Sequence, residues 1–277
     1  MKGRKNFKRW IGIILTICLF ILVFWNQPIY RYYKIDGKQE IFDLKVILIS
    51  DLHSSTYGTG QRRLMNMITE EAPDMIWITG DLMDEYRSIQ GAVEFLEGIK
   101  DECPIYYVSG NHEYWHDDPE LVFETIKAYG VMILENESVT LNIRDNEITI
   151  TGVIDPDATL AYSGKEALIR SLSQVEDMDS QTGYRVLLSH RPEHIEVYES
   201  YGFDLVVSGH THGGQVRIPF LINGLYAPNQ GFMPKYAGGY YAYTKDTDLI
   251  VSRGLSFNPR LPRVFNPPEV VVIEWYD

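Results

Sequence analysis

The sequence predicts an α/β fold with mixed sheets, preceded by one N-terminal transmembrane helix. Three observations support this fold class: buried-strand patterns alternate with helical patterns, two hairpin patterns occur among them, and a long uncharged stretch lies near the N-terminus. Alternating strands and helices favour α/β, and the hairpins require antiparallel neighbours. Of the 277 residues, 45% are hydrophobic and 23% charged, which excludes a disordered chain and a multi-span membrane protein.

The N-terminal segments differ sharply in charge. Residues 1–9 carry five basic residues and no acid, whereas residues 10–25 carry no charge. A helix over 10–25 covers roughly 24 Å at ~1.5 Å per residue, slightly less than the ~30 Å hydrocarbon core. We therefore expect a cytoplasmic basic segment, a transmembrane anchor over 10–25, and a juxtamembrane linker over 26–40. A cleaved signal peptide and a buried core helix are the alternatives, although no small-residue cleavage site follows the apolar stretch.

One globular domain is expected over residues 41–277, outside the cytoplasm because the basic flank stays inside. Continuous apolar runs predict strands, and apolar residues at intervals of three and four predict helices. The predicted strands cover residues 45–50, 75–79, 104–109, 131–134, 184–189, 204–208 and 270–275. The predicted helices cover residues 60–72, 88–100, 119–129, 164–177 and 192–200. Hairpins are predicted over residues 138–153 and 240–252.

The charge of the chain limits its partners. Subtracting the five basic residues of the N-terminal segment from 25 leaves 20 basic against 38 acidic residues, so residues 10–277 sum to −18. An acidic domain is not expected to bind nucleic acid without sequence preference. It would also repel a phosphate-bearing substrate, unless cations such as metal ions lie in its site. The two cysteines exclude a disulfide scaffold and a cysteine-based zinc site. Nothing in the sequence indicates an oligomeric state.

Polar residues, most of them of types that bind metal ions, follow five of the predicted strands. They are Asp51 and His53, Asp81 and Asp84, Asn111 and His112, His190, and finally His210 and His212. The carboxyl ends of strands in an α/β sheet line one edge, where ligands bind, so these segments should converge. Carboxylate and imidazole are ligands of Mn²⁺, Zn²⁺ and Fe. Polar turns that hold no metal are the alternative interpretation.

These segments, in this order, resemble the calcineurin-like metallophosphoesterases. The resemblance spans residues 46–275 and rests on Asp-x-His, Gly-Asp, Gly-Asn-His-Glu and Gly-His-Thr-His-Gly-Gly. It implies a four-layer α/β/β/α sandwich. The stretches SGHTHGGQVRIPF (208–220), SRGL (252–255) and PPE (267–269) are typical of the bacterial membrane-anchored or exported branch. Some members of that branch act on phosphodiesters, and some cleave the pyrophosphate of UDP-2,3-diacylglucosamine.

The resemblance also implies a role for each candidate residue. Two divalent ions would be held by seven side chains: Asp51, His53 and His212 for the first, Asn111, His190 and His210 for the second, and Asp81 for both. His112 is the candidate acid that protonates the leaving oxygen. Asp84 would orient His112 through a hydrogen bond. The alternatives are that His112 only binds phosphate and that Asp84 caps a helix.

Together these features predict a membrane-anchored phosphoesterase with two divalent ions (Mn²⁺, Zn²⁺ or Fe). Its substrate would be a phosphodiester or pyrophosphate, such as an envelope lipid or a nucleotide-linked compound. A phosphomonoesterase and a non-catalytic metal-binding domain are the competing hypotheses. Three arginines, Arg217, Arg253 and Arg260, lie in or near the branch-typical stretches. They would contact substrate phosphate or form surface ion pairs.

Overall fold

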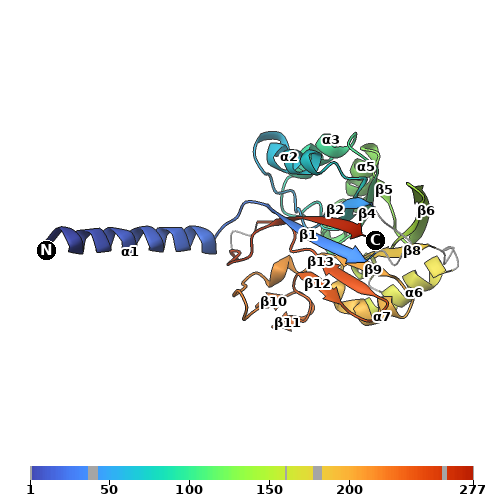
Figure 1. The fold of residues 1–277 in the computed structure, drawn as a ribbon. Coiled ribbons are helices and arrows are strands. Elements are labelled where there is room, and N and C mark those ends of the chain that lie inside the picture. The colour runs from blue at the N-terminus through green and yellow to red at the C-terminus, as the bar shows by residue number, and fades with distance from the viewer. Residues whose placement is uncertain (1, 37–42, 160, 177–182, 258–260, 277) are drawn as a thin grey trace.

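Two six-stranded mixed sheets form the centre of the fold (Figure 1). The structure is a computed structural model that describes residues 2–36, 43–159, 161–176, 183–257 and 261–276. Arg260 lies outside this part of the chain. The first sheet has the order β1 (Ile29–Asp36), β14 (Glu269–Tyr276), β2 (Lys45–Ile49), β3 (Met75–Thr79), β4 (Ile105–Val108) and β5 (Met132–Ile133). Strands β2 to β5 are parallel, and β14 is antiparallel to β2.

The second sheet also has parallel central strands, but both of its edge strands are antiparallel to their neighbours. Its order is β12 (Gly239–Ala242), β13 (Asp248–Val251), β9 (Leu205–Ser208), β8 (Tyr184–Leu188), β7 (Asn146–Gly152) and β6 (Glu137–Ile143). Strands β13, β9, β8 and β7 are parallel, whereas β12 and β6 close the sheet as antiparallel hairpin partners. A short separate hairpin joins β10 (Tyr226–Ala227) to β11 (Gly231–Phe232).

The two sheets pack face to face, and helices cover their outer faces (Figure 1). Because side chains alternate along a strand, β2 sends Val46 and Leu48 into the apolar layer between the sheets and Ile47 and Ile49 toward the helices. Helices α2 (Arg62–Glu71), α3 (Gln90–Ile99) and α5 (Pro119–Ala128) cover the first sheet. Helices α6 (Gly164–Glu176) and α7 (Ile195–Glu199) cover the second. The expected α/β/β/α layering is therefore present.

Most of the predicted strands and helices are confirmed, and the main difference lies before β2. The sequence indicates a linker over residues 26–40, but residues 29–36 form β1, which pairs in parallel with β14 along its whole length. The physical reason is that this edge strand is only partly buried, so its tyrosines and charged residues do not give the continuous apolar pattern of the central strands. The short helix α4 (Asn111–Trp115) and the β10–β11 hairpin also have no counterpart among the predicted elements.

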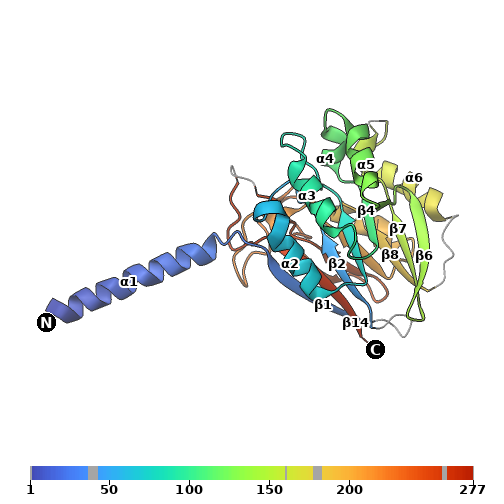
Figure 2. The ribbon, with the colours of Figure 1, turned by 90° about the horizontal axis from the view of Figure 1, so that it is seen from above.

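Helix α1 (Lys2–Val23) projects away from the two-sheet domain in both views (Figures 1 and 2). It begins within the basic segment and ends two residues before Trp25. Within the described part of the chain, none of the helices combines the length and the apolar character needed to span a bilayer. The transmembrane anchor expected over residues 10–25 therefore stays a prediction.

The layer between the sheets should dominate the stability of the domain. Trp77 on β3 is fully buried there, and its ring meets Trp275 edge-on with centroids 6.0 Å apart. We expect Trp77→Ala to lower the free energy of unfolding by about 3–5 kcal/mol, because it removes a large side chain from a close-packed core. Urea denaturation followed by circular dichroism measures the loss. Trp115→Ala is the matched control, since Trp115 is 51% exposed; equal losses in the two variants would contradict this account of the core.

Candidate metal centre

The candidate site residues lie together at the C-terminal ends of the parallel strands of both sheets. In the first sheet, Asp51 and His53 follow β2, Asp81 and Asp84 follow β3, and Asn111 and His112 begin α4 directly after β4. In the second sheet, His190 follows β8, and His210 and His212 follow β9. The parallel strands therefore bring together side chains that lie up to 161 positions apart (51 to 212).

Asp81 lies at the centre of this group. Its Oδ2 atom is 3.1 Å from His190 Nε2, 3.4 Å from His53 Nε2 and 3.9 Å from His112 Nε2. The side chain is buried, and Oδ2 accepts no hydrogen bond. Its other oxygen accepts the backbone N–H of His112 at 3.0 Å. One carboxylate oxygen thus faces three imidazoles that come from both sheets.

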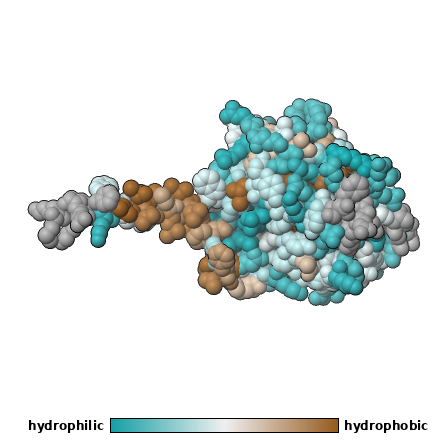
Figure 3. All heavy atoms as spheres, viewed as in Figure 1, coloured by the Kyte–Doolittle hydropathy of each residue, from teal (hydrophilic) through white to brown (hydrophobic). Residues whose placement is uncertain are grey.

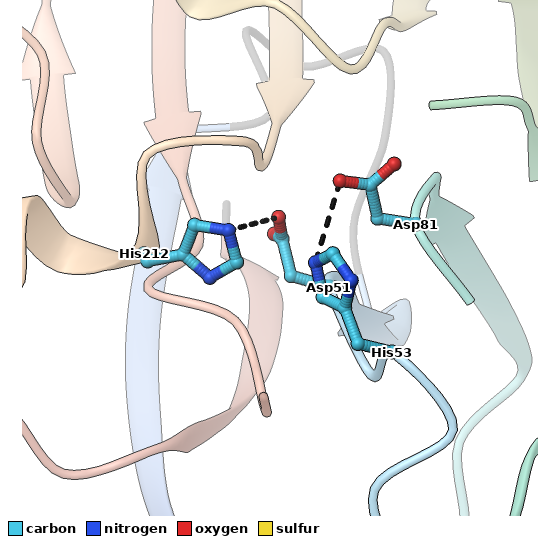
Figure 4. Close-up of side chains that lie close together, drawn as sticks. All are labelled: Asp51, His53, Asp81 and His212. Atoms are coloured by element: carbon cyan, nitrogen blue, oxygen red, sulfur yellow. Dashed lines mark ion pairs between the residues drawn. The ribbon is translucent and has the colours of Figure 1, made fainter. Parts of the chain in front are cut away.

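Two sets of ligand atoms share this carboxylate. Asp51, His53, Asp81 and His212 each offer an atom within 4.8 Å of the others, and Figure 4 shows these four side chains converging. In this set His212 Nε2 lies 3.6 Å from Asp51 Oδ1.

The second set contains Asp81, His190 and His210, again within 4.8 Å of one another. Asn111 follows the strand next to β3, and its buried Oδ1 atom has no hydrogen-bond partner. Both sets contain Asp81, the residue expected to bind both ions, and the unpaired buried amide oxygen of Asn111 is suited to a cation. Which ion each side chain binds stays a prediction.

Hydrogen bonds on the far side of the imidazoles fix which nitrogen faces the centre. His190 Nδ1 donates to the carbonyl of Thr79 at 2.7 Å, which leaves Nε2 toward Asp81. His212 Nδ1 bonds to Ser256 Oγ at 2.8 Å, and His210 Nε2 to Asn229 Oδ1 at 2.7 Å. Such outer contacts are characteristic of metal-binding histidines, because they set the tautomer and the ring orientation.

The facing atoms at His190 provide a direct test of whether a cation fits. A neutral His190 that donates through Nδ1 has a lone pair at Nε2, and this lone pair faces the carboxylate of Asp81. Two acceptors at 3.1 Å need a positive charge between them, either a proton or a metal ion. Burial disfavours the charged imidazole, yet Asp81 raises the pKa of His190 to about 10. The cluster therefore suits a dinuclear site for divalent cations.

Glu113 holds the loops that carry the ligands. Its buried carboxylate accepts the backbone N–H groups of Gly110, Asp81, Leu82 and Met83 at distances of 2.8, 3.0, 2.7 and 3.2 Å. It thereby joins the loop after β3 to the loop after β4. The close approach requires glycine, because a Cβ atom on Gly110 would lie 2.2 Å from Asp81 Oδ1.

The contacts of Asp84 and His112 differ from the sequence-based expectation. Asp84 was expected to orient His112, but its Oδ2 lies 3.3 Å from His53 Nδ1, and its Oδ1 accepts the N–H of Tyr86 at 2.9 Å. Glu85, which the sequence interpretation did not single out, pairs with His112 Nδ1 instead. The physical reason is that the short Asp84 side chain closes the turn to residue 86, while the longer Glu85 reaches the imidazole. Asp84 also does not cap a helix.

A cavity of about 390 Å³ opens onto this centre. Its lining includes His53, His112, His212, Glu85, Arg87 and Phe257. His112 keeps 20% of its side chain exposed, whereas His53 is 5% exposed. A substrate in the cavity would therefore meet His112 at the edge of the metal centre.

Comparison with known proteins supports this assignment. Residues 44–214 match the sequence profile of the calcineurin-like phosphoesterase family. An uncharacterized metallophosphoesterase of Campylobacter jejuni is 31% identical over 83% of this chain and 59% of its own length. One from Helicobacter pylori strain J99 is 32% identical over 98% of this chain and 71% of its own length. The chain thus spans about three fifths of the first relative and nearly three quarters of the second.

A more distant relative and one solved structure extend the comparison. A transmembrane protein with a metallophosphoesterase domain from Danio rerio is 27% identical over 83% of this chain and 52% of its own length. The NAD nucleotidase of Haemophilus influenzae has a similar fold, with a TM-score of 0.50 and 12% identity over 77% of this chain and 45% of that protein. The profile match over more than half of the chain, the H. pylori relative and the buried Asp/His centre lead to one conclusion: the chain belongs to the calcineurin-like phosphoesterase family of metal-dependent phosphoester hydrolases.

Proposed function

We propose that this chain hydrolyses phosphodiester or pyrophosphate bonds with two divalent metal ions. The observation that carries the proposal is the unpaired Oδ2 of Asp81, which faces three imidazole nitrogens in a buried site. The proposed ligands are Asp51, His53 and His212 for the first ion, Asn111, His190 and His210 for the second, and Asp81 for both. The sequence and the ligand types leave Mn²⁺, Zn²⁺ and Fe as candidates.

His112 is proposed to donate a proton to the leaving oxygen. When bound, the two ions supply an activated water and neutralise the phosphoryl oxygens. Side chains of the protein orient the proton donor. Glu85 holds His112 through Nδ1, so the ring presents Nε2 toward the centre, 3.9 Å from Asp81 Oδ2. A proton on Nε2 is then in position for a leaving group in the cavity, where His112 is partly exposed.

The charges around the cavity support a diester or pyrophosphate substrate. Asp84 and Glu85 line it with negative charge. Arg87 also lines it, but the guanidinium donates to the carbonyls of His53 and Phe257 and to Ser55 Oγ. A monoester carries nearly two negative charges on one phosphorus, whereas diesters and pyrophosphate diesters carry one per phosphorus. A cavity whose arginine is already engaged by the chain favours the lower charge.

We also propose that residues 10–25 hold the enzyme at a membrane, with the basic N-terminus in the cytoplasm and the catalytic domain outside. Residues 10–22 of α1 are exposed, including Trp10, Phe20 and Leu22, each at 63–64%. The relative from Danio rerio is named a transmembrane protein. A membrane location favours an envelope lipid or a nucleotide-linked compound as the substrate, as in the branch that the sequence motifs resemble.

Turnover of simple phosphate esters tests the proposed reaction. The full chain, loaded with Mn²⁺, should hydrolyse bis-p-nitrophenyl phosphate with a higher kcat/KM than p-nitrophenyl phosphate, because the cavity favours one charge per phosphorus. Release of p-nitrophenol measures both rates. Preference for the monoester would support the phosphomonoesterase hypothesis instead. Bound metal without turnover of either ester would support a non-catalytic domain.

Removal of the shared carboxylate tests the metal centre. We expect Asp81→Ala to lose both ions rather than one, because its carboxylate belongs to both ligand sets. Metal content per chain, measured by mass spectrometry after dialysis, gives the result. Asp101→Ala is the matched control, since Asp101 is an exposed acid outside the site. Retention of one full equivalent of metal in Asp81→Ala would rule out the shared role.

Separate substitutions at Asp84 and Glu85 test the corrected pairing. Asp84→Asn should lower metal affinity by about 10–100-fold, because Asp84 contacts His53. Glu85→Gln should keep both metals and lower the rate of hydrolysis of esters with poor leaving groups. His112→Ala should lower the same rate by about 10²–10⁴-fold. Metal titrations and rates for aryl and alkyl diesters measure the two effects. The opposite pattern would restore Asp84 as the partner of His112.

A further inference from the structure

A second pocket, lined by three arginines, lies beside the C-terminal end of α1. Arg31, Arg217 and Arg253 border a cavity of about 710 Å³, together with the apolar residues Phe220 and Leu221. It shares no lining residue with the cavity at the metal centre. Phe265, which also lines it, donates its backbone N–H to the carbonyl of Val23 at 2.7 Å. This contact places the pocket next to Val23, the last residue of α1.

The positive charges of the arginines at this pocket outnumber the negative charges that contact them. Glu269 is fully buried, and its Oε2 lies 3.3 Å from Arg253 Nε and 3.8 Å from Arg31 Nε. In the described part of the chain, Arg217 donates hydrogen bonds to two neutral acceptors, Asn223 Oδ1 and the carbonyl of Gly213. Three guanidinium groups therefore meet one carboxylate. Burial, and then the neighbouring charge of Arg253, lower the pKa of Arg217 to about 10.

Exposed apolar side chains border the same pocket. Phe220 is 106% exposed and Leu221 is 79% exposed, relative to the reference for each residue type. Phe232 and Met233, on and after β11, are also exposed, although they do not line this pocket. Figure 3 shows apolar surface on the side of the domain from which α1 emerges, continuing the apolar surface of the helix. Apolar patches of this kind on a folded domain mark binding surfaces.

We propose that this arginine pocket binds the phosphate headgroup of an anionic phospholipid, while Phe220 and Leu221 enter the acyl region, so that this face of the domain docks on a lipid surface. The combination of charge and apolar residues carries the inference. A free phosphate ion would interact with the arginines alone, whereas an anionic lipid surface would interact with both the arginines and the exposed apolar side chains. Residues 10–277 sum to −18 (20 basic against 38 acidic residues), so this local excess of cations is selective within the domain, most of whose surface repels an anionic membrane. The site is distinct from the metal centre, and docking does not depend on the proposed reaction.

Flotation with lipid vesicles tests the docking site. The full chain is mixed with phosphatidylcholine vesicles, with or without phosphatidylglycerol, and the bound fraction is measured. The test variant is Arg31→Gln with Arg217→Gln. Arg253 is kept, because its loss would leave the buried Glu269 without its nearest cation. We expect the wild-type chain to prefer vesicles with phosphatidylglycerol, and the double variant to lose about 30-fold in partitioning to them at low salt.

Matched controls separate the pocket from net charge. Lys100→Gln with Arg170→Gln removes two positive charges that do not line the pocket; Lys100 pairs with Glu97 at the end of α3, and Arg170 pairs with Glu166 within α6. This control should keep the preference for anionic vesicles. A second test variant, Phe220→Ser with Leu221→Ser, should weaken binding to the same vesicles while leaving all three arginines in place. Circular dichroism and metal content verify that each variant is folded.

Competition with inorganic phosphate distinguishes the two sources of the anion. If a lipid headgroup is the ligand, millimolar phosphate at constant ionic strength should leave the vesicle preference intact. The lipid assignment would be overturned by two results together: inorganic phosphate binds the wild-type chain but not the double arginine variant, and the wild-type chain shows no preference for anionic vesicles. An unchanged preference in the double arginine variant would overturn the site itself.

Discussion

The unpaired carboxylate oxygen of Asp81 is the constraint on which the metal centre depends. It is buried between the ends of two sheets, and imidazoles from both sheets face it. A buried anion facing lone pairs is unfavourable unless a cation lies among them. The geometry therefore favours a bound cation between the Asp81 carboxylate and these imidazoles. The strands position the ligands, and divalent ions bound among them would supply this positive charge.

Holding so many ligands on short turns has a conformational cost. Five of the proposed ligands have a backbone in the left-handed region, with φ between 46° and 70°: Asp51, His53, Asp81, His210 and His212. Non-glycine residues adopt this region only where the surroundings enforce it, and they concentrate at functional sites. Here Glu113 supplies part of that enforcement, since it binds four backbone N–H groups. Asp51 is fixed in turn by Ser50 Oγ and by the N–H of His210.

The strand pattern could predict an α/β fold with mixed sheets and the convergence of the ligands, whereas the four-layer arrangement was implied by the family resemblance. A buried strand followed by Asp-x-His or His-x-His places its side chains at a known sheet edge. Local choices between neighbouring residues could not be predicted in this way. Asp84 and Glu85 are adjacent carboxylates, and only the turn between them decides which one reaches His112. Edge strand β1 was missed because half-exposed tyrosines and charges resemble a linker.

The metal centre and the arginine pocket are joined through the backbone. Gly254 makes room for Asp51, because a Cβ atom there would lie 2.6 Å from Asp51 Cβ, while the preceding Arg253 lines the arginine pocket. A second connection runs from Gln215, at the cavity of the metal centre, to Arg217 two residues later. Docking through the arginines would therefore fix the metal centre at a constant height and orientation above a lipid surface. Such positioning would favour substrates whose phosphate lies at that surface over substrates free in solution.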